Sequence, residues 1–145
     1  MDIATIGFTG KSAKKFFDLI KSSGIRRIVD TRAHNTSQLA GFAKRDDLAY
    51  FLRVICNVDY VVEPTLAPTA ELLSAYRKKT IEWDEYAHAY VALISSRNVA
   101  AHLNASLAFG SCLLCSEASP HHCHRRLAAE YLKEAWGDVQ VRHLE

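Results

Sequence analysis

Long hydrophobic runs, a strong net charge and low-complexity tracts are all missing from this chain of 145 residues. Because no window approaches about 20 uncharged apolar residues, the sequence contains no candidate transmembrane helix. A formal net charge of +2 gives no global reason to expect a nucleic-acid or membrane surface. The hydrophobic content of 49% excludes a disordered tail, and no Pro- or Gly-rich linker divides the chain. We therefore expect one domain over residues 1–145, long enough to bury its own core.

The amino terminus also lacks the pattern of a signal peptide. It reads MDIATIGFTG, with an acidic residue at position 2 and no extended apolar stretch. We therefore expect a cytoplasmic protein without a membrane partner. Since thiols are normally kept reduced in the cytoplasm, the four cysteines do not imply two disulfides.

Short apolar runs alternate with amphipathic stretches along the chain. The apolar runs predict strands at residues 3–7, 25–32, 58–64, 111–117 and 139–144. The amphipathic stretches predict helices at 12–23, 44–56, 69–79, 82–103 and from 122 or 123 to 136. Ser12 is the candidate N-cap of the first helix, and Gly24 is its candidate C-terminal stop.

This alternation predicts an α/β fold. We expect a single three-layer domain in which a mostly parallel five-stranded sheet carries helices on both faces. Ligands of such sheets bind beyond the carboxyl ends of the strands. The loops expected to form the site are therefore 7–11, 30–43 and 115–126.

Cysteine and histidine are concentrated in one segment, CLLCSEASPHHCHRR at 112–126. It is expected to run from a buried strand, through a turn, into a helix whose free N–H groups and dipole favour an anion. Arg125 and Arg126 fall in the first helical turn. Either they lie on the exterior, or at least one contacts a phosphate or carboxylate bidentately.

The cysteines of this segment allow two kinds of chemistry. Cys112-x2-Cys115 with Cys123 and His124 offers zinc ligands, but residues three apart in a strand point to opposite faces. We therefore assign Cys112 to the core and expect no metal or cofactor. Cys123 near a helix N-terminus, beside Arg125, has the electropositive setting that lowers a thiol pKa. Cysteines packed beneath the helix turn, without a chemical role, are an equally open interpretation.

Carboxylates stand at the ends of two predicted strands. Glu117 is a candidate general base or a partner for an arginine. Asp30 continues an apolar run, so it is expected to be partly buried and to need a partner such as Arg32. Asp30 and Arg32 either form a structural pair beside the sheet, or they meet Glu117 and Arg125 around a ligand in one cleft.

Three pieces of the sequence together resemble the domain-of-unknown-function 488 family. They are the opening T-I-G, the strand end V-D-x-R at 29–32, and the block C-x-E-x-x-P-x-x-C-H-R at 115–125. The ending at 141–144 also fits, so the resemblance extends over almost the whole chain. The loop after residue 32 keeps Phe42 but lacks the proline and basic residues often found there in the family.

The resemblance implies a compact α/β domain but no reaction. It favours treating a set of seven residues as one site: Asp30, Arg32, Cys115, Glu117, Cys123, His124 and Arg125. The expected function is that of an enzyme, a hydrolase or transferase, acting on a phosphorylated small molecule, a nucleotide or a nucleic-acid component.

The roles expected in this enzyme follow from the residue types. The catalytic residues are expected to be Glu117, Asp30, Cys123 and His124, with the histidine as a proton shuttle. The substrate is expected to contact Arg32, Arg125, Cys115 and Gly7. A non-catalytic module that binds nucleic acid or a protein through basic residues is one alternative. A thiol redox or zinc protein is the other.

Overall fold

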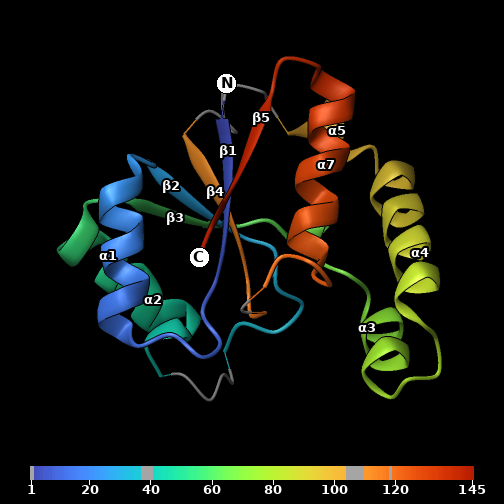
Figure 1. The fold of residues 1–145 in the computed structure, drawn as a ribbon, viewed down its shortest axis with the longest axis horizontal. Helices are drawn as coiled ribbons and strands as arrows, with labels where there is room; N and C mark the ends of the chain where they lie inside the picture. The colour runs from blue at the N-terminus through green and yellow to red at the C-terminus, as the bar shows by residue number, and fades with distance from the viewer. Residues whose placement is uncertain (1, 37–40, 104–109, 118) are drawn as a thin grey trace.

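The computed structural model describes residues 2–36, 41–103, 110–117 and 119–145 (Figure 1). Its five strands form one sheet in the order β3-β2-β4-β1-β5, and every pair is parallel. The strands are β1 (Asp2–Gly7), β2 (Arg27–Asp30), β3 (Asp59–Val62), β4 (Ser111–Cys115) and β5 (Gln140–Leu144). The predicted α/β class is confirmed, and the sheet is fully rather than mostly parallel.

One face of the sheet is covered by α1 (Ala13–Ser23), the 3-10 turn η1 (Gly41–Ala43), α2 (Arg45–Phe51) and the π-helical turn η2 (Leu52–Cys56). Both predicted ends of α1 are confirmed. The Ser12 side chain accepts a hydrogen bond from the Lys15 backbone N–H, and Gly24 takes a left-handed φ of 78° that favours glycine.

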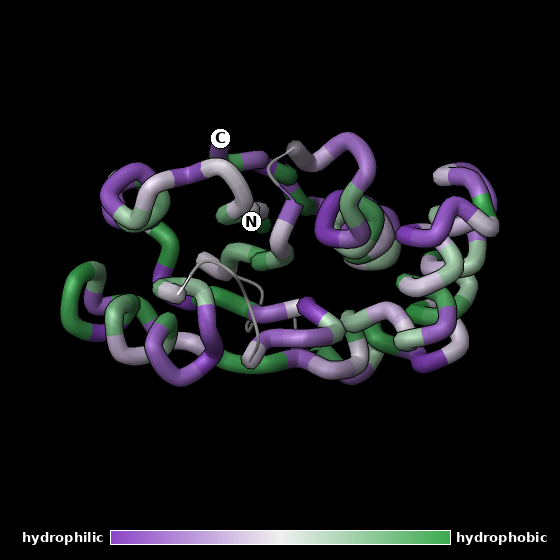
Figure 2. The backbone as a smooth tube through the Cα atoms, turned by 90° about the horizontal axis from the view of Figure 1, so that it is seen from below, coloured by the Kyte–Doolittle hydropathy of each residue, from purple (hydrophilic) through white to green (hydrophobic). Residues whose placement is uncertain are grey.

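The other face carries η3 (Pro64–Leu66), α3 (Ala70–Arg77), α4 (Trp83–Ser96), α5 (Val99–His102) and α7 (His124–Trp136). The helix predicted over 82–103 is divided in two, because Asn98 adopts a left-handed φ of 56° between α4 and α5. In Figure 2 the helical turns alternate between hydrophilic and hydrophobic colours, as expected for helices that turn one side to a sheet.

Strand β4 lies at the centre and is buried along its whole length. Cys112 and Leu114 pack into the core beneath α1 and α2, whereas Leu113 packs into the core beneath α4 and α7. Cys112 is fully buried, so its assignment to the core is confirmed, and burial raises the pKa of its thiol. Helices on both faces explain why the strand reads as a continuous apolar run.

The connections that follow β2 and β4 diverge. The chain after β2 leads to α2 on one face, and the chain after the neighbouring β4 leads to α7 on the other. Such a reversal opens a crevice at the carboxyl ends of the two strands. Within the described parts of the chain, no helix has the length and apolar character needed to span a bilayer.

Candidate functional site

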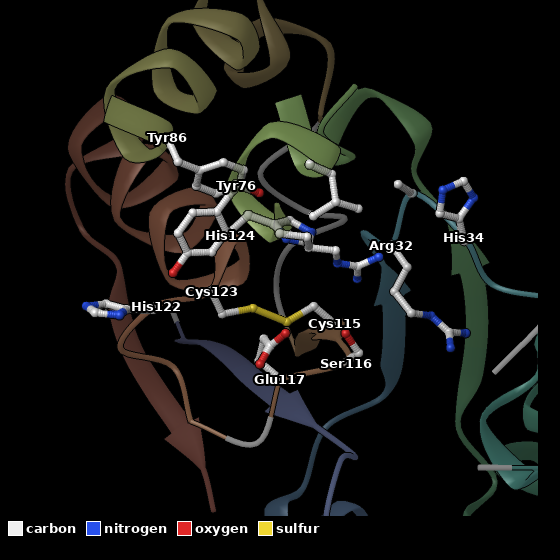
Figure 3. A pocket seen from close by; sticks show the side chains of 13 residues that line it. Arg32, His34, Tyr76, Tyr86, Cys115, Ser116, Glu117, His122, Cys123 and His124 are labelled. Atoms are coloured by element: carbon white, nitrogen blue, oxygen red, sulfur yellow. A yellow bond between two sulfur atoms is a disulfide. The ribbon is translucent and has the colours of Figure 1, made fainter. Parts of the chain in front are cut away.

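A pocket opens at the carboxyl ends of β2 and β4 (Figure 3). The loop after β2 contributes residues 32–34, and the segment that joins β4 to α7 contributes most of the opposite side. Helices α3 and α4 close the third side. The lining side chains include Arg32, His34, Tyr76, Arg77, Tyr86, Cys115, Glu117, His122, Cys123 and His124.

Two cysteines eight residues apart lie in the wall of this pocket and form a disulfide. Cys115 is the last residue of β4, and Cys123 is the N-cap of α7. We expected reduced cysteines, and no pattern in the sequence indicated that these two would pair. The pairing arises because α7 packs on β4, which brings the N-cap of the helix to the last residue of the strand. Cys56 and Cys112 are free.

Arg125 lies behind the two sulfur atoms and is completely buried. Its Nη1 donates to Cys115 Sγ at 3.2 Å and to Cys123 Sγ at 3.7 Å, and also to the backbone oxygen of Glu117. Its Nε donates to Thr5 Oγ1 at 3.3 Å. Arg125 is therefore neither on the exterior nor among the residues that line the pocket. A cation that donates to both sulfur atoms stabilises their thiolate forms after reduction.

Asp30 and Arg32 form a buried ion pair, as one of the two sequence interpretations proposed. Arg32 Nε and Nη2 donate to the two carboxylate oxygens at 2.9 and 2.8 Å, and Nη1 donates to the Ala43 carbonyl. The Tyr60 hydroxyl donates to the same carboxylate. Burial, followed by this hydrogen bond, raises the pKa of Tyr60 well above its ordinary value. Arg32 reaches the pocket wall, whereas Asp30 is not among the lining residues.

Glu117 is exposed and lines the pocket, two residues beyond the end of β4. Its backbone oxygen packs directly on Gly7, where an added Cβ would overlap it. The carbonyl of Gly7 accepts a hydrogen bond from Lys11 Nζ at 2.8 Å. Gly7 is outside the pocket lining, so it affects the site by allowing this close backbone approach.

His124 is buried beside the disulfide in the first turn of α7. Its Nε2 lies 2.8 Å from the carbonyl oxygen of Thr31 and 3.0 Å from Thr31 Oγ1. Burial lowers the pKa of the imidazole to about 4, so the ring is neutral at neutral pH. Of the seven residues expected to share one site, the pocket brings together Arg32, Cys115, Glu117, Cys123 and His124.

Several pocket residues were not predicted. Tyr76 and Arg77 come from α3 and Tyr86 comes from α4, and their spacing in the sequence matches ordinary core-facing helices. The Tyr76 and Tyr86 rings stack with centroids 4.8 Å apart. At the rim, the His122 ring stacks on Trp83 at the same centroid distance. No signal in the sequence separates such rings from core aromatics, because only the packing of α3 against α4 brings them to the pocket.

A family model described as "Domain of unknown function DUF488" matches residues 12–132. This range includes the V-D-x-R strand end and the whole 115–125 block, but neither the T-I-G opening nor the 141–144 ending. No curated protein and no solved structure matches the chain.

Proposed function

The chain belongs to the DUF488 family, and we propose that it is an enzyme, a hydrolase or transferase, that acts on a small anionic substrate of the nucleotide type. The substrate would bind in the pocket at the carboxyl ends of β2 and β4. One observation carries the proposal: the loop after β2, the segment from β4 to α7, and two helices all contribute polar or aromatic side chains to this one pocket. Its position is the usual ligand site of a doubly wound parallel sheet.

The side chains of the pocket favour an anion that carries a flat ring. Arg77 is exposed and makes no ion pair with any residue in the described ranges. Arg32 is already neutralised by Asp30, and Arg125 is buried behind the sulfur atoms. Arg77 therefore replaces these two residues as the candidate phosphate ligand. The stacked rings of Tyr76 and Tyr86 supply a flat apolar wall.

Glu117 is the proposed general acid and base. Among the described residues it is the one carboxylate that lines the pocket, and its exposure gives a bound substrate or water direct access to it. In this mechanism Glu117 accepts a proton from the attacking water or hydroxyl group and returns it to the leaving oxygen. Asp30 has no comparable access, because Arg32 and Tyr60 occupy its carboxylate.

The proposal is tested with a panel of nucleotides and sugar phosphates, by measuring hydrolysis and group transfer with the full chain. On the substrate found, Glu117→Gln is expected to lower kcat by about 10² to 10⁴ with little change in KM. Arg77→Met should raise KM about tenfold or more, whereas Lys78→Met, its exposed neighbour outside the pocket lining, should leave KM unchanged. Full activity of the Glu117→Gln enzyme would overturn the assignment of the base.

A second function is favoured by one specific observation, the joined sulfur atoms of Cys115 and Cys123. A thiol redox protein would exchange this pair with a small disulfide: two protein thiols become one protein disulfide, and the small disulfide is released as two thiols. The chain is first reduced and then exposed to glutathione disulfide, and its free thiols are counted before and after exposure. A Cys56→Ser variant should still exchange, whereas Cys115→Ser and Cys123→Ser should stop at a mixed disulfide.

A further inference from the structure

When the Cys115–Cys123 disulfide is reduced, three metal-ligand atoms become available side by side. They are the two sulfur atoms and one ring nitrogen of His124, and all lie within 4.8 Å of one another. We propose that the reduced protein binds one zinc ion through Cys115, Cys123 and His124. This site goes beyond the proposed function and stands independently of it.

The ligand set fits zinc by chemistry and by number. Thiolate and imidazole are the ligands that zinc prefers, and the ion takes a tetrahedral arrangement of four. Two cysteines and one histidine supply three, and all three side chains line the pocket. Three protein ligands leave a fourth position for water or substrate, as in zinc enzymes that keep one position open.

The surrounding groups hold these three ligands in place. Arg125 Nη1 donates to both sulfur atoms, and Thr5 and the Glu117 backbone fix the guanidinium in turn. The Thr31 carbonyl binds Nε2 of His124 at 2.8 Å. A protonated Nε2 donates to that carbonyl and leaves the other ring nitrogen as a ligand, the arrangement by which backbone carbonyls usually orient metal-binding histidines.

The structure excludes Cys112 and Cys115 as a pair of zinc ligands. Cys112 packs fully buried in the core beneath α1 and α2, away from the pocket. Cys115 therefore pairs with Cys123 instead of Cys112. The zinc ion and the disulfide require the same two sulfur atoms, so zinc binds only to the reduced chain.

The position of Glu117 gives the metal a chemical consequence. Zinc lowers the pKa of a bound water to about 7, and Glu117 lies in the same pocket, two residues after Cys115. If zinc were bound, Glu117 would be the carboxylate of the pocket lining available to accept the proton of that water. This consequence rests on the proposed function, whereas zinc binding itself does not.

The test uses the reduced, metal-free full chain under anaerobic conditions. Cobalt(II) is titrated as the spectroscopic probe, zinc is added to displace it, and elemental analysis gives the stoichiometry. We expect one cobalt per chain, tetrahedral visible bands and a thiolate-to-cobalt absorption that zinc removes. Cys115→Ser, Cys123→Ser and His124→Gln should each weaken binding at least 100-fold. Thr31→Val, which removes a hydroxyl near His124, should weaken it about 10-fold.

Matched controls separate a metal site from adventitious thiol binding. Cys56→Ser and Cys112→Ala should bind cobalt as the wild type does, because neither cysteine lies in the pocket lining. The oxidised wild type should bind none. Absence of the thiolate-to-cobalt band in the reduced wild type would overturn the proposal, and this result does not depend on whether the ligand variants fold. Loss of cobalt binding in a well-folded Cys56→Ser protein would also overturn it. Because none of these measurements uses turnover, failure of the metal site leaves the Glu117→Gln test of the proposed function intact.

Discussion

Two groups of polar side chains lie at the carboxyl-terminal edge of the sheet, around the ends of β2 and β4. They differ in how many of their reactive atoms already have a partner. In the first, Arg32 and Tyr60 occupy both carboxylate oxygens of Asp30. In the second, the sulfur atoms of Cys115 and Cys123 and the carboxylate of Glu117 line the pocket. The first group therefore stabilises the end of β2, and the second offers atoms for chemistry.

The largest expected loss of stability comes from disrupting the first group. Asp30→Asn leaves the buried Arg32 guanidinium without its counter-charge, and loss of one partner of a buried pair costs about 3–5 kcal/mol. Chemical denaturation measures the free energy of unfolding. Asp59→Asn, an exposed residue of neighbouring β3, is the control and should change it by less than about 0.5 kcal/mol. A stable Asp30→Asn protein that has lost only its activity would return Asp30 to the catalytic residues.

Acid should destabilise the fold through His124, which lines the same pocket as the second group. In the unfolded chain this histidine binds a proton below its ordinary pKa of 6.5, whereas burial lowers the pKa in the folded protein to about 4. The unfolded state therefore binds more protons between these values, and stability falls as the pH drops from 6.5 towards 4. The loss reaches at most about 3 kcal/mol.

This pH dependence is measured by denaturation at a series of pH values in the presence of a chelator. His124→Gln should flatten the slope over that range, whereas replacement of His88, exposed on α4, should leave it unchanged. An unchanged slope in the His124→Gln protein would contradict the buried, neutral histidine.

A smaller effect is expected at Gly7, which packs against the backbone of Glu117. Gly7→Ala places a Cβ on the Glu117 backbone oxygen, so the segment after β4 must shift. We expect a loss of about 1–3 kcal/mol, the usual range for overpacking. Gly41→Ala is the matched control, because its Cβ would meet nothing within 4 Å. Equal stability of the two variants, measured by thermal unfolding, would contradict the close contact at Gly7.

The smallest expected change in stability belongs to Glu117. Its side chain is exposed, so Glu117→Gln should alter the free energy of unfolding by no more than about 0.5 kcal/mol. Glu117→Gln and Asp30→Asn together compare a residue assigned to function with a residue assigned to stability. A large loss of stability in Glu117→Gln would move Glu117 from the functional to the structural group.

Much of the fold is predictable because its signals are local. Ser12 and Gly24 end α1 as expected, since a cap and a left-handed glycine act within one turn of their own helix. The pairing of Asp30 with Arg32 was one of the two interpretations that their two-residue spacing left open. The helix over 82–103 was predicted as continuous, because Asn98, which adopts the left-handed conformation at the break, is neither a proline nor a glycine.

The site is less predictable because its contacts join distant parts of the chain. Tyr60 reaches Asp30 from the next strand, and Arg125 reaches Thr5 across 120 residues. The sequence indicated that residues 115–125 are chemically unusual. It did not indicate which of them line the pocket and which are buried beneath it. Arg125 and Glu117 look equivalent as charged residues, and only burial distinguishes them.

By itself the sequence determined the α/β class, the alternation of strands and helices, and the segments that follow β2 and β4 as candidate loops. These follow from side-chain periodicity and from caps, which depend on neighbours along the chain. Only the tertiary structure decided that Cys115 meets Cys123 rather than Cys112, and that Arg77 rather than Arg125 reaches the pocket. The physical reason is that the parallel sheet and the packing of α7 on β4 fix which side chains meet, and no local pattern in the chain records that geometry.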